Sequence, residues 1–382
     1  MAINHVDLGH RSVYSRGADT AACAREVVAG LQGTDAAAVV FFASPAHDGR
    51  RIARELKQAF PGAAVMGCTT AGEFSEAAMG DGGVSAVALP RGVVRRAMAA
   101  MGDFRGGVDE GVRGALGSLA QQAKAPLRAL DPARHVGLVL IEGMHGHEER
   151  INEILGNEAP LLSFVGGTAG DDLKFQRTEV FQDAESTTNG LALLLLELDV
   201  PYTVLKTCSY EKLGKKLTIT RVDAVERIVW EIDGRPAAEA YAEALGTTAD
   251  RLDSAEFATY PVALLMNDEP WIRCVQQVKP GGGLSFACRL LEGMEVEVMR
   301  NTDIIAETTS AVRDAVARVG GKASGAVLFN CAWRKLEVEK KGLAKEFLGS
   351  LGGIRAAGFH TYGESWLGHM NCTLTGVIFG AR

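Results

Sequence analysis

The sequence predicts an α/β protein of two domains, with mixed sheets flanked by helices and with internal strand–helix–strand repeats. Its 382 residues exceed the usual size of one small domain. Short apolar runs of strand-forming residues alternate with amphipathic helical segments, and this plan recurs along the chain. The composition, 47% apolar and 23% charged residues, is that of a globular protein and excludes a disordered or fibrous chain.

The first repeat begins with the apolar run Ala38–Ala43, which is too short for a typical helix and rich in strand formers. Asp48 is a suitable cap for a helix through residue 60, and Pro61-Gly62 ends that helix. A second short strand, Ala63–Met66, leads into a glycine-containing turn that ends at Glu73. The strand Val84–Leu89 completes the unit.

Two further copies follow the same plan. The expected strands are Val136–Ile141, Leu161–Val165 and Leu191–Leu196 in the second copy and Ala326–Phe329, Ile354–Phe359 and Thr373–Phe379 in the third, with helices at 146–157 and 340–351. In all three copies the pattern Thr-x-Gly-[Glu/Asp] follows the strand–helix–strand unit, at Thr70–Glu73, Thr168–Asp171 and Thr361–Glu364. The shared context of this pattern indicates an internal duplication.

Residues 201–320 differ from the repeats. They predict short strands and two helices; the strands are Leu217–Val222, Arg227–Ile232, Val262–Met266, Ile272–Val278, Leu284–Ala287 and Glu295–Met299, and the helices are Ala237–Leu245 and Thr302–Val319. We therefore expect a domain boundary near residue 225, which gives domains 1–225 and 226–382.

The three Thr-x-Gly-acid turns are the candidate ligand site, because α/β folds gather ligand groups at the carboxyl ends of strands. Glycine allows close backbone approach, and the hydroxyl and carboxylate supply polar contacts. The candidate ligand-binding residues are Thr69, Thr70, Gly72, Glu73, Thr168, Asp171, Thr361, Tyr362 and Glu364. The alternative is a purely structural turn in which Thr and the acid bond to local groups.

Charge and cysteine content favour a cytoplasmic protein that binds neither nucleic acid nor membranes. The net charge is −7 and no basic run is present, which argues against a nucleic-acid binder. The chain has no apolar stretch of membrane-spanning length and no recognisable signal peptide. Seven cysteines without a C-x-x-C pair predict reduced thiols, and Cys68, Cys274, Cys288, Cys331 and Cys372 are expected in the core.

Two histidines in the third copy are candidate cofactor ligands. His360 precedes the Thr of the turn, and His369 lies just before the last strand. A neutral imidazole at a strand end is what a metal or haem centre requires, with Arg334 or Lys335 available to pair with a haem propionate. The alternative for either histidine is a hydrogen bond to a neighbouring carbonyl.

Five segments of the chain resemble signatures of FIST domain proteins, which are bacterial sensory proteins with an N-terminal and a C-terminal part. They are Ala64–Glu73 with Gly80-Asp-Gly, Phe164–Asp172, Asp233–Ala237, Ala326–Cys331 and Gly358–Glu364. The resemblance covers the chain from about residue 35 to residue 380. It implies a small-ligand sensor in signal transduction, and family members are often fused to kinase, cyclase or chemoreceptor modules.

This chain departs from the fused arrangement, because it ends at Arg382 without room for an output domain. It therefore resembles the stand-alone FIST proteins that bind haem, sense nitric oxide and regulate a separate histidine kinase. The resemblance implies haem as a cofactor, with His369 as the first and His360 as the second candidate ligand. A sensor of amino acids or similar small metabolites without haem is the alternative within the family.

An enzyme is the competing function from another class. Glu73 and Glu364 are suited to acid–base chemistry if they share a pocket and their pKa values diverge. The sequence lacks a nucleophile motif, a metal cluster and a phosphate loop, so we expect a protein without enzymatic activity.

Overall fold

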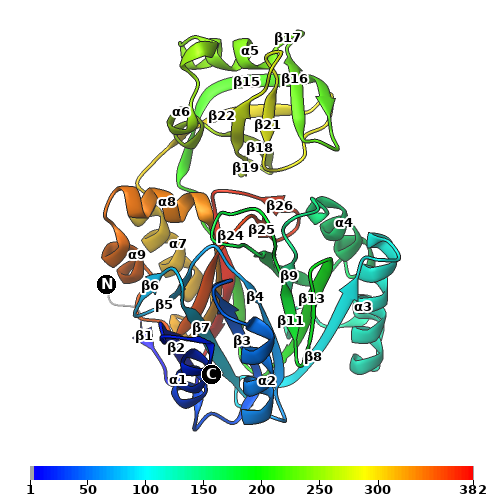
Figure 1. Cartoon of the computed structure of the whole chain (residues 1–382), viewed down its shortest axis with the longest axis vertical. Coiled ribbons are helices and arrows are strands. Elements are labelled where there is room, and N and C mark those ends of the chain that lie inside the picture. The colour runs from blue at the N-terminus through cyan, green and yellow to red at the C-terminus, as the bar shows by residue number, and fades with distance from the viewer. Residues whose placement is uncertain (1–3, 382) are drawn as a thin grey trace. The chain divides into compact units, whose positions relative to one another are not determined.

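The computed structural model describes residues 4–381 as an α/β protein with mixed sheets flanked by helices (Figure 1), which confirms the predicted fold class. The chain forms two compact units. Unit 1 comprises the chain up to Thr207, Thr308–His369 and the chain from Leu374, and unit 2 comprises Cys208–Glu307 and Met370–Thr373. Because these units are not consecutive stretches, the expected division near residue 225 stays a prediction.

Unit 1 contains three sheets with one shared plan, which confirms the internal strand–helix–strand repeats. In each sheet two parallel strands lie side by side, and a third strand runs antiparallel to the first of them. These triplets are β3 (Ala36–Ala43), β4 (Ala64–Thr69) and β7 (Val84–Pro90); β9 (His135–Ile141), β10 (Ser163–Thr168) and β13 (Gly190–Leu198); β23 (Lys322–Cys331), β24 (Ala356–Thr361) and β27 (Leu374–Gly380). An antiparallel edge strand completes each set: β2 (Arg11–Ser15), β8 (Val94–Asp103) and β14 (Tyr202–Lys206).

Helices join the parallel strands, as the repeat pattern predicts. In the first copy α2 (Gly49–Ala59) begins where the Asp48 carboxylate accepts a hydrogen bond from the Arg51 amide, so the predicted cap is confirmed. In the second copy the connecting helix is α4 (Glu148–Glu158). The helix expected at 340–351 is present as the shorter α9 (Ala344–Ser350), and α8 (Ala332–Lys340), which precedes it, was not predicted. Gly342, with φ +68°, separates the two helices.

The core explains why the first strands of the repeats are apolar at every position. Along β3 alternate side chains point to opposite faces, so Val40 and Phe42 enter a central core while Val39 and Phe41 contact the helices. The central core also receives Phe329 from the third sheet and Leu140 from the second. Because both faces of these strands are covered, the sequence shows continuous apolar runs instead of alternation.

The remaining elements of unit 1 cover or extend these sheets. Helix α1 (Thr20–Leu31) packs on the first sheet with α2, and α3 (Val108–Ala123) packs on the second with α4. A 3₁₀ turn, Leu127–Ala129, follows α3. The short strands are β1 (Asn4–His5), β5 (Glu73–Ser75), β6 (Met79–Gly80), β11 (Val180–Gln182), β12 (Glu185–Thr187) and β25 (Glu364–Ser365). Strand β26 (His369–Met370) and helix α7 (Ile304–Arg318) span the points where the chain passes between the units.

Unit 2 has a sheet of its own, with Ile219, Tyr241 and Val298 in its apolar core. The strand order is β19-β18-β22-β15-β16-β21-β20, and β17 pairs with β16. The strands are β15 (Tyr210–Asp223), β16 (Ile228–Ile232), β17 (Arg235–Pro236), β18 (Val262–Met266), β19 (Glu269–Arg273), β20 (Val275–Val278), β21 (Leu284–Phe286) and β22 (Glu295–Asn301). Its helices are α5 (Ala237–Leu245), α6 (Ser254–Thr259) and a 3₁₀ turn at Ala249–Arg251.

Unit 2 also contains a disulfide bond between Cys274 and Cys372. The prediction that all seven thiols are reduced is therefore wrong for this pair. The two cysteines are 98 residues apart, and no local spacing announces their pairing. Cys68, Cys288 and Cys331 are buried, as expected, and do not take part in this disulfide. Within residues 4–381 no helix has the length and apolar character needed to cross a membrane.

Candidate functional site

The three Thr-x-Gly-acid turns of unit 1 are exchanged between the three sheets. After its turn, the first copy contributes β5 to the sheet of the third copy, where β5 pairs with β24. The third copy contributes β25 to the sheet of the second copy, where it pairs with β10. The second copy contributes β11 to the first sheet, where it pairs with β4. The exchange is cyclic, so each turn lies against the turn of another copy.

Backbone hydrogen bonds join the turns in the same cyclic order. The Ala71 amide donates to the His360 carbonyl over 3.0 Å, and the His360 amide donates to the Gly72 carbonyl over 2.8 Å. The Tyr362 amide donates to the Thr168 carbonyl over 3.1 Å, and the Gly170 amide donates to the Thr69 carbonyl over 3.0 Å. We call residues 69–73, 168–172 and 360–364 together the turn cluster. The structure thus brings together all of the predicted ligand residues.

Two of the three turns close on themselves through identical side-chain contacts. The Thr70 hydroxyl donates to the Glu73 carboxylate, and the Thr361 hydroxyl donates to the Glu364 carboxylate. All four side chains are buried. The other oxygen of Glu73 accepts the Gly83 amide over 3.0 Å, which ties the turn to the glycine-rich loop 80–83. These contacts are those expected if the turn is purely structural, with its Thr and its acid bonded to local groups. A ligand cleft shared by Glu73 and Glu364 stays a prediction.

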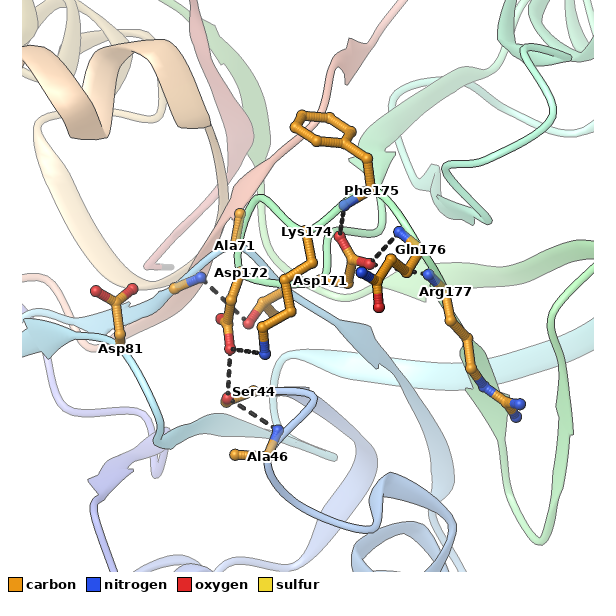
Figure 2. A network of polar contacts seen from close by, with 12 residues as sticks. Ser44, Ala46, Ala71, Asp81, Asp171, Asp172, Lys174, Phe175, Gln176 and Arg177 are labelled. Carbon is orange, nitrogen blue, oxygen red and sulfur yellow. Dashed lines mark hydrogen bonds and ion pairs between the residues drawn. The ribbon is translucent and has the colours of Figure 1, made fainter.

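The second turn differs because Asp171 is one methylene shorter than glutamate. Its carboxylate accepts the amides of residues 175, 176 and 177 (Figure 2). It also accepts the hydroxyl of Tyr362. Burial raises the pKa of Asp171, but these hydrogen bonds outweigh it and lower the pKa below its ordinary value. The Thr168 hydroxyl is left buried without a partner among the described residues.

Glu73 has the opposite electrostatics. Burial raises its pKa to about 8, although the hydrogen bonds from Thr70 and from the Gly83 amide lower it. The nearby carboxylates Asp172 and Asp81 raise it further. Burial also raises the pKa of Asp172, whose carboxylate accepts the Ser44 hydroxyl over 3.2 Å (Figure 2). The turn cluster therefore holds two carboxyl groups, Glu73 and Asp172, whose charged form is disfavoured.

One buried cation faces these acids. Lys335 donates to the Ala71 carbonyl over 3.0 Å and to the Asp81 carboxylate, which the loop 80–83 places beside the turn. Lys335 was expected at most as a propionate partner, and Asp81 was not expected at the site. Their partnership spans 254 residues, so no local pattern reveals it. The sequence does mark Asp81 itself, because this carboxylate stands between Gly80 and Gly82, but it does not mark its partner.

His360 does not fit an axial haem ligand in this structure. The Asn330 side-chain amide lies 2.9 Å from its Nδ1, and the ring packs against Phe74 and Phe347. Burial, with the charges of Lys335 and Arg334, lowers the pKa of His360 well below its ordinary value. The imidazole is therefore neutral, but its surroundings are filled by side chains and offer no space for a porphyrin face.

His369 is the remaining candidate for haem. It is buried, and its ring lies over Gly363, where a Cβ atom would come within 2.1 Å of Cε1. Haem binding through His369 stays a prediction. Arg334, the other expected propionate partner, is buried, and it donates to the Asn330 side-chain oxygen and to the Thr308 hydroxyl.

A surface cavity of about 540 Å³ in unit 1 lies apart from these residues. Its lining includes Arg50 and Arg105, but the Arg50 guanidinium bonds to Glu179 and that of Arg105 bonds to Asp103. Two of the three arginines that line this cavity are thus already paired, and Arg54 is the third.

Two family models match consecutive parts of the chain. The FIST N domain matches residues 37–235, and the FIST C domain matches residues 237–366. No curated protein matches the chain. The FIST N match alone covers more than half of the sequence and includes two of the three turns. The chain therefore belongs to the FIST family of sensory domains.

Proposed function

We propose that this protein is a non-enzymatic sensor that binds a small ligand at the turn cluster and passes the signal to a separate signalling protein. FIST domains are associated with small-ligand sensing in signal transduction, which supports the general role. The observation that carries the proposal is the cyclic hydrogen bonding of the three turns. A shift of one turn strains its bonds to the next, so an event at one turn is felt by all three copies.

A sensor needs two states for which the ligand has different affinities. In the unliganded state the polar groups of the cluster bond to one another, as Thr70 does to Glu73 and Asp81 does to Lys335. A ligand that competes for these groups favours a second arrangement of the loops. A coupling free energy of about 1–3 kcal/mol between the ligand and a partner is sufficient for a signal.

The partner that we propose is a sensor histidine kinase. The test begins with a thermal-shift screen of small metabolites on the purified chain, followed by kinase autophosphorylation with and without the best ligand. We expect a stabilising metabolite that changes the kinase rate only when this protein is present. Catalytic turnover of the metabolite, with the kinase rate unchanged, contradicts the proposal.

A haem-based nitric oxide sensor is the finer alternative implied by the stand-alone members of the family. Haem supplies a gas-binding iron, and His369 is the residue of this chain that would hold it. No contact of the described residues favours this alternative over a metabolite.

A further inference from the structure

Lys335 of α8 is a buried cation whose anionic partner is largely exposed. The Lys335 side chain is 5% exposed, whereas that of Asp81 is 55% exposed. A second carboxylate, Glu339 on the same helix, is farther away at 3.7 Å. A buried ammonium group requires hydrogen-bonding partners. Here its main anionic partner is one that solvent already reaches.

Asp81 is held in a way that allows its carboxylate to leave while its loop stays in place. It lies between Gly80 and Gly82, and Gly82 has φ +74°. The loop backbone is anchored independently, because the Gly83 amide donates to Glu73 and Arg16 donates to the Asp81 carbonyl over 2.9 Å. Within the described residues, Lys335 is the only side chain that hydrogen-bonds to the Asp81 carboxylate.

A second donor, on the ring of His360, has no partner among the residues that the structure describes. Since the Asn330 amide donates to Nδ1 of His360, the neutral ring carries its hydrogen on Nε2. This buried atom has no hydrogen-bond partner within residues 4–381. The ring edge faces Gly72. A Cβ atom on Gly72 would lie 3.1 Å from His360 Cδ2, 3.0 Å from Lys335 Nζ and 2.7 Å from an Asp81 oxygen.

The place beside Gly72, which we call the seat, therefore holds the Lys335 ammonium group, the Asp81 carboxylate and the Cδ2 edge of the His360 ring, next to its Nε2 donor. We propose that Asp81 is a built-in substitute for the carboxylate of a small organic acid, which displaces it from Lys335 and also accepts from Nε2 of His360. This inference rests on the proposed sensor function and names its ligand class. The displaced Asp81 carboxylate becomes free to turn toward solvent while its loop stays anchored, and this change at the surface is what a partner reads.

The charge around the seat favours a carboxylate over a phosphate. The seat offers one cation and one neutral donor, while Glu73 and Asp172 lie close enough to Asp81 to interact electrostatically with it. A monoanionic group balances the single ammonium group, whereas a phosphate dianion leaves excess negative charge beside buried acids.

The test is chemical rescue of Asp81→Ala by acetate. The variant leaves the Lys335 ammonium group without its main anion, and we expect a lower melting temperature. Sodium acetate, compared with sodium chloride at equal ionic strength, restores at least half of the loss in a saturable manner. The double variant Asp81→Ala/Lys335→Met raises the half-saturating acetate concentration at least about tenfold, which is the effect of losing about 1.4 kcal/mol.

The matched control is Asp35→Ala, because Asp35 pairs with Arg91 in an exposed ion pair. Acetate does not rescue this variant beyond chloride. If Asp81→Ala does not fold, Asp81→Asn is titrated with acetate instead. The Nε2-bound proton of His360 in this variant is then followed by NMR. Equal effects of acetate and chloride on the Asp81 variant overturn the inference.

The outcome separates this inference from the sensor function. One result is a metabolite from the screen that stabilises the parent protein and Lys335→Met equally and still changes the kinase rate. That result supports the sensor function and contradicts ligand binding at the seat. If the screen yields no ligand but acetate rescues Asp81→Ala, the seat stands and the sensor function fails.

Discussion

Replacing Glu73 by glutamine is expected to remove much of the pH dependence of stability in unit 1. The glutamine side chain keeps the shape of a protonated glutamate, so it is able to accept the Gly83 amide and donate to the Thr70 hydroxyl. It differs in one respect, because it has no charge to gain when the pH rises. The variant therefore isolates the ionisation of one buried carboxyl group.

The magnitude follows from the pKa of Glu73, which is about 8 in the folded protein against an ordinary 4.5. A carboxyl whose pKa is raised by folding contributes stability that is complete below pH 4.5 and is lost as the pH rises through 8. Between pH 5 and pH 8 this one group lowers the free energy of unfolding of the parent protein by about 3 kcal/mol. The free energy of unfolding of Glu73→Gln does not fall in this way, because the glutamine side chain does not ionise.

The assay is urea unfolding at pH 5, 6, 7 and 8, monitored by circular dichroism, for the parent, Glu73→Gln and the exposed-site control Glu226→Gln. We expect the difference in unfolding free energy between Glu73→Gln and the parent to rise in favour of the variant by about 3 kcal/mol from pH 5 to pH 8. The control difference stays flat. A flat difference for Glu73→Gln as well would refute the assignment of a raised pKa to this carboxyl.

Three further changes test other parts of the site. Tyr362→Phe removes a donor to the Asp171 carboxylate, so we expect the free energy of unfolding at pH 7 to fall by about 1–3 kcal/mol. Stability also becomes less sensitive to acid below pH 4, and urea titrations at pH 7 and below pH 4 measure both effects. Gly72→Ala places a side chain where φ is +111° and the space is occupied, and we expect a loss of at least about 1–3 kcal/mol by thermal unfolding. His369→Ala is titrated with haemin beside the parent; a Soret band that is present in the parent and lost in the variant assigns the ligand, and its absence from both removes haem. An unchanged stability in either of the first two variants contradicts the contacts described for it.

The strands and the repeat were predictable because they depend on local pattern. A run such as Ala38–Ala43 is covered on both faces, and burial on both faces leaves a continuous apolar stretch in the sequence. The helix cap at Asp48 is likewise a local signal. The recurrence of the Thr-x-Gly-acid pattern after each strand–helix–strand unit then indicated that the turns occupy equivalent positions.

The contacts of the site were not predictable, because they join distant parts of the chain. The exchange of β5, β11 and β25 between sheets is a tertiary feature without a local signature. Asp171 belongs to the predicted pattern, yet its shorter side chain bonds to loop amides where glutamate bonds to its own threonine. Lys335 has its partner 254 residues away, and its burial is visible only in the fold.

Hydrogen–deuterium exchange of the parent protein, with and without a stabilising metabolite from the thermal screen, tests the central claim most directly. If the turn cluster is the sensing centre, ligand binding slows exchange in residues 69–73, 168–172 and 360–364 together. Stabilisation of the closed turns by about 1–3 kcal/mol on binding slows exchange about 5- to 150-fold. Slowing in one turn alone, or only in unit 2, would contradict the account.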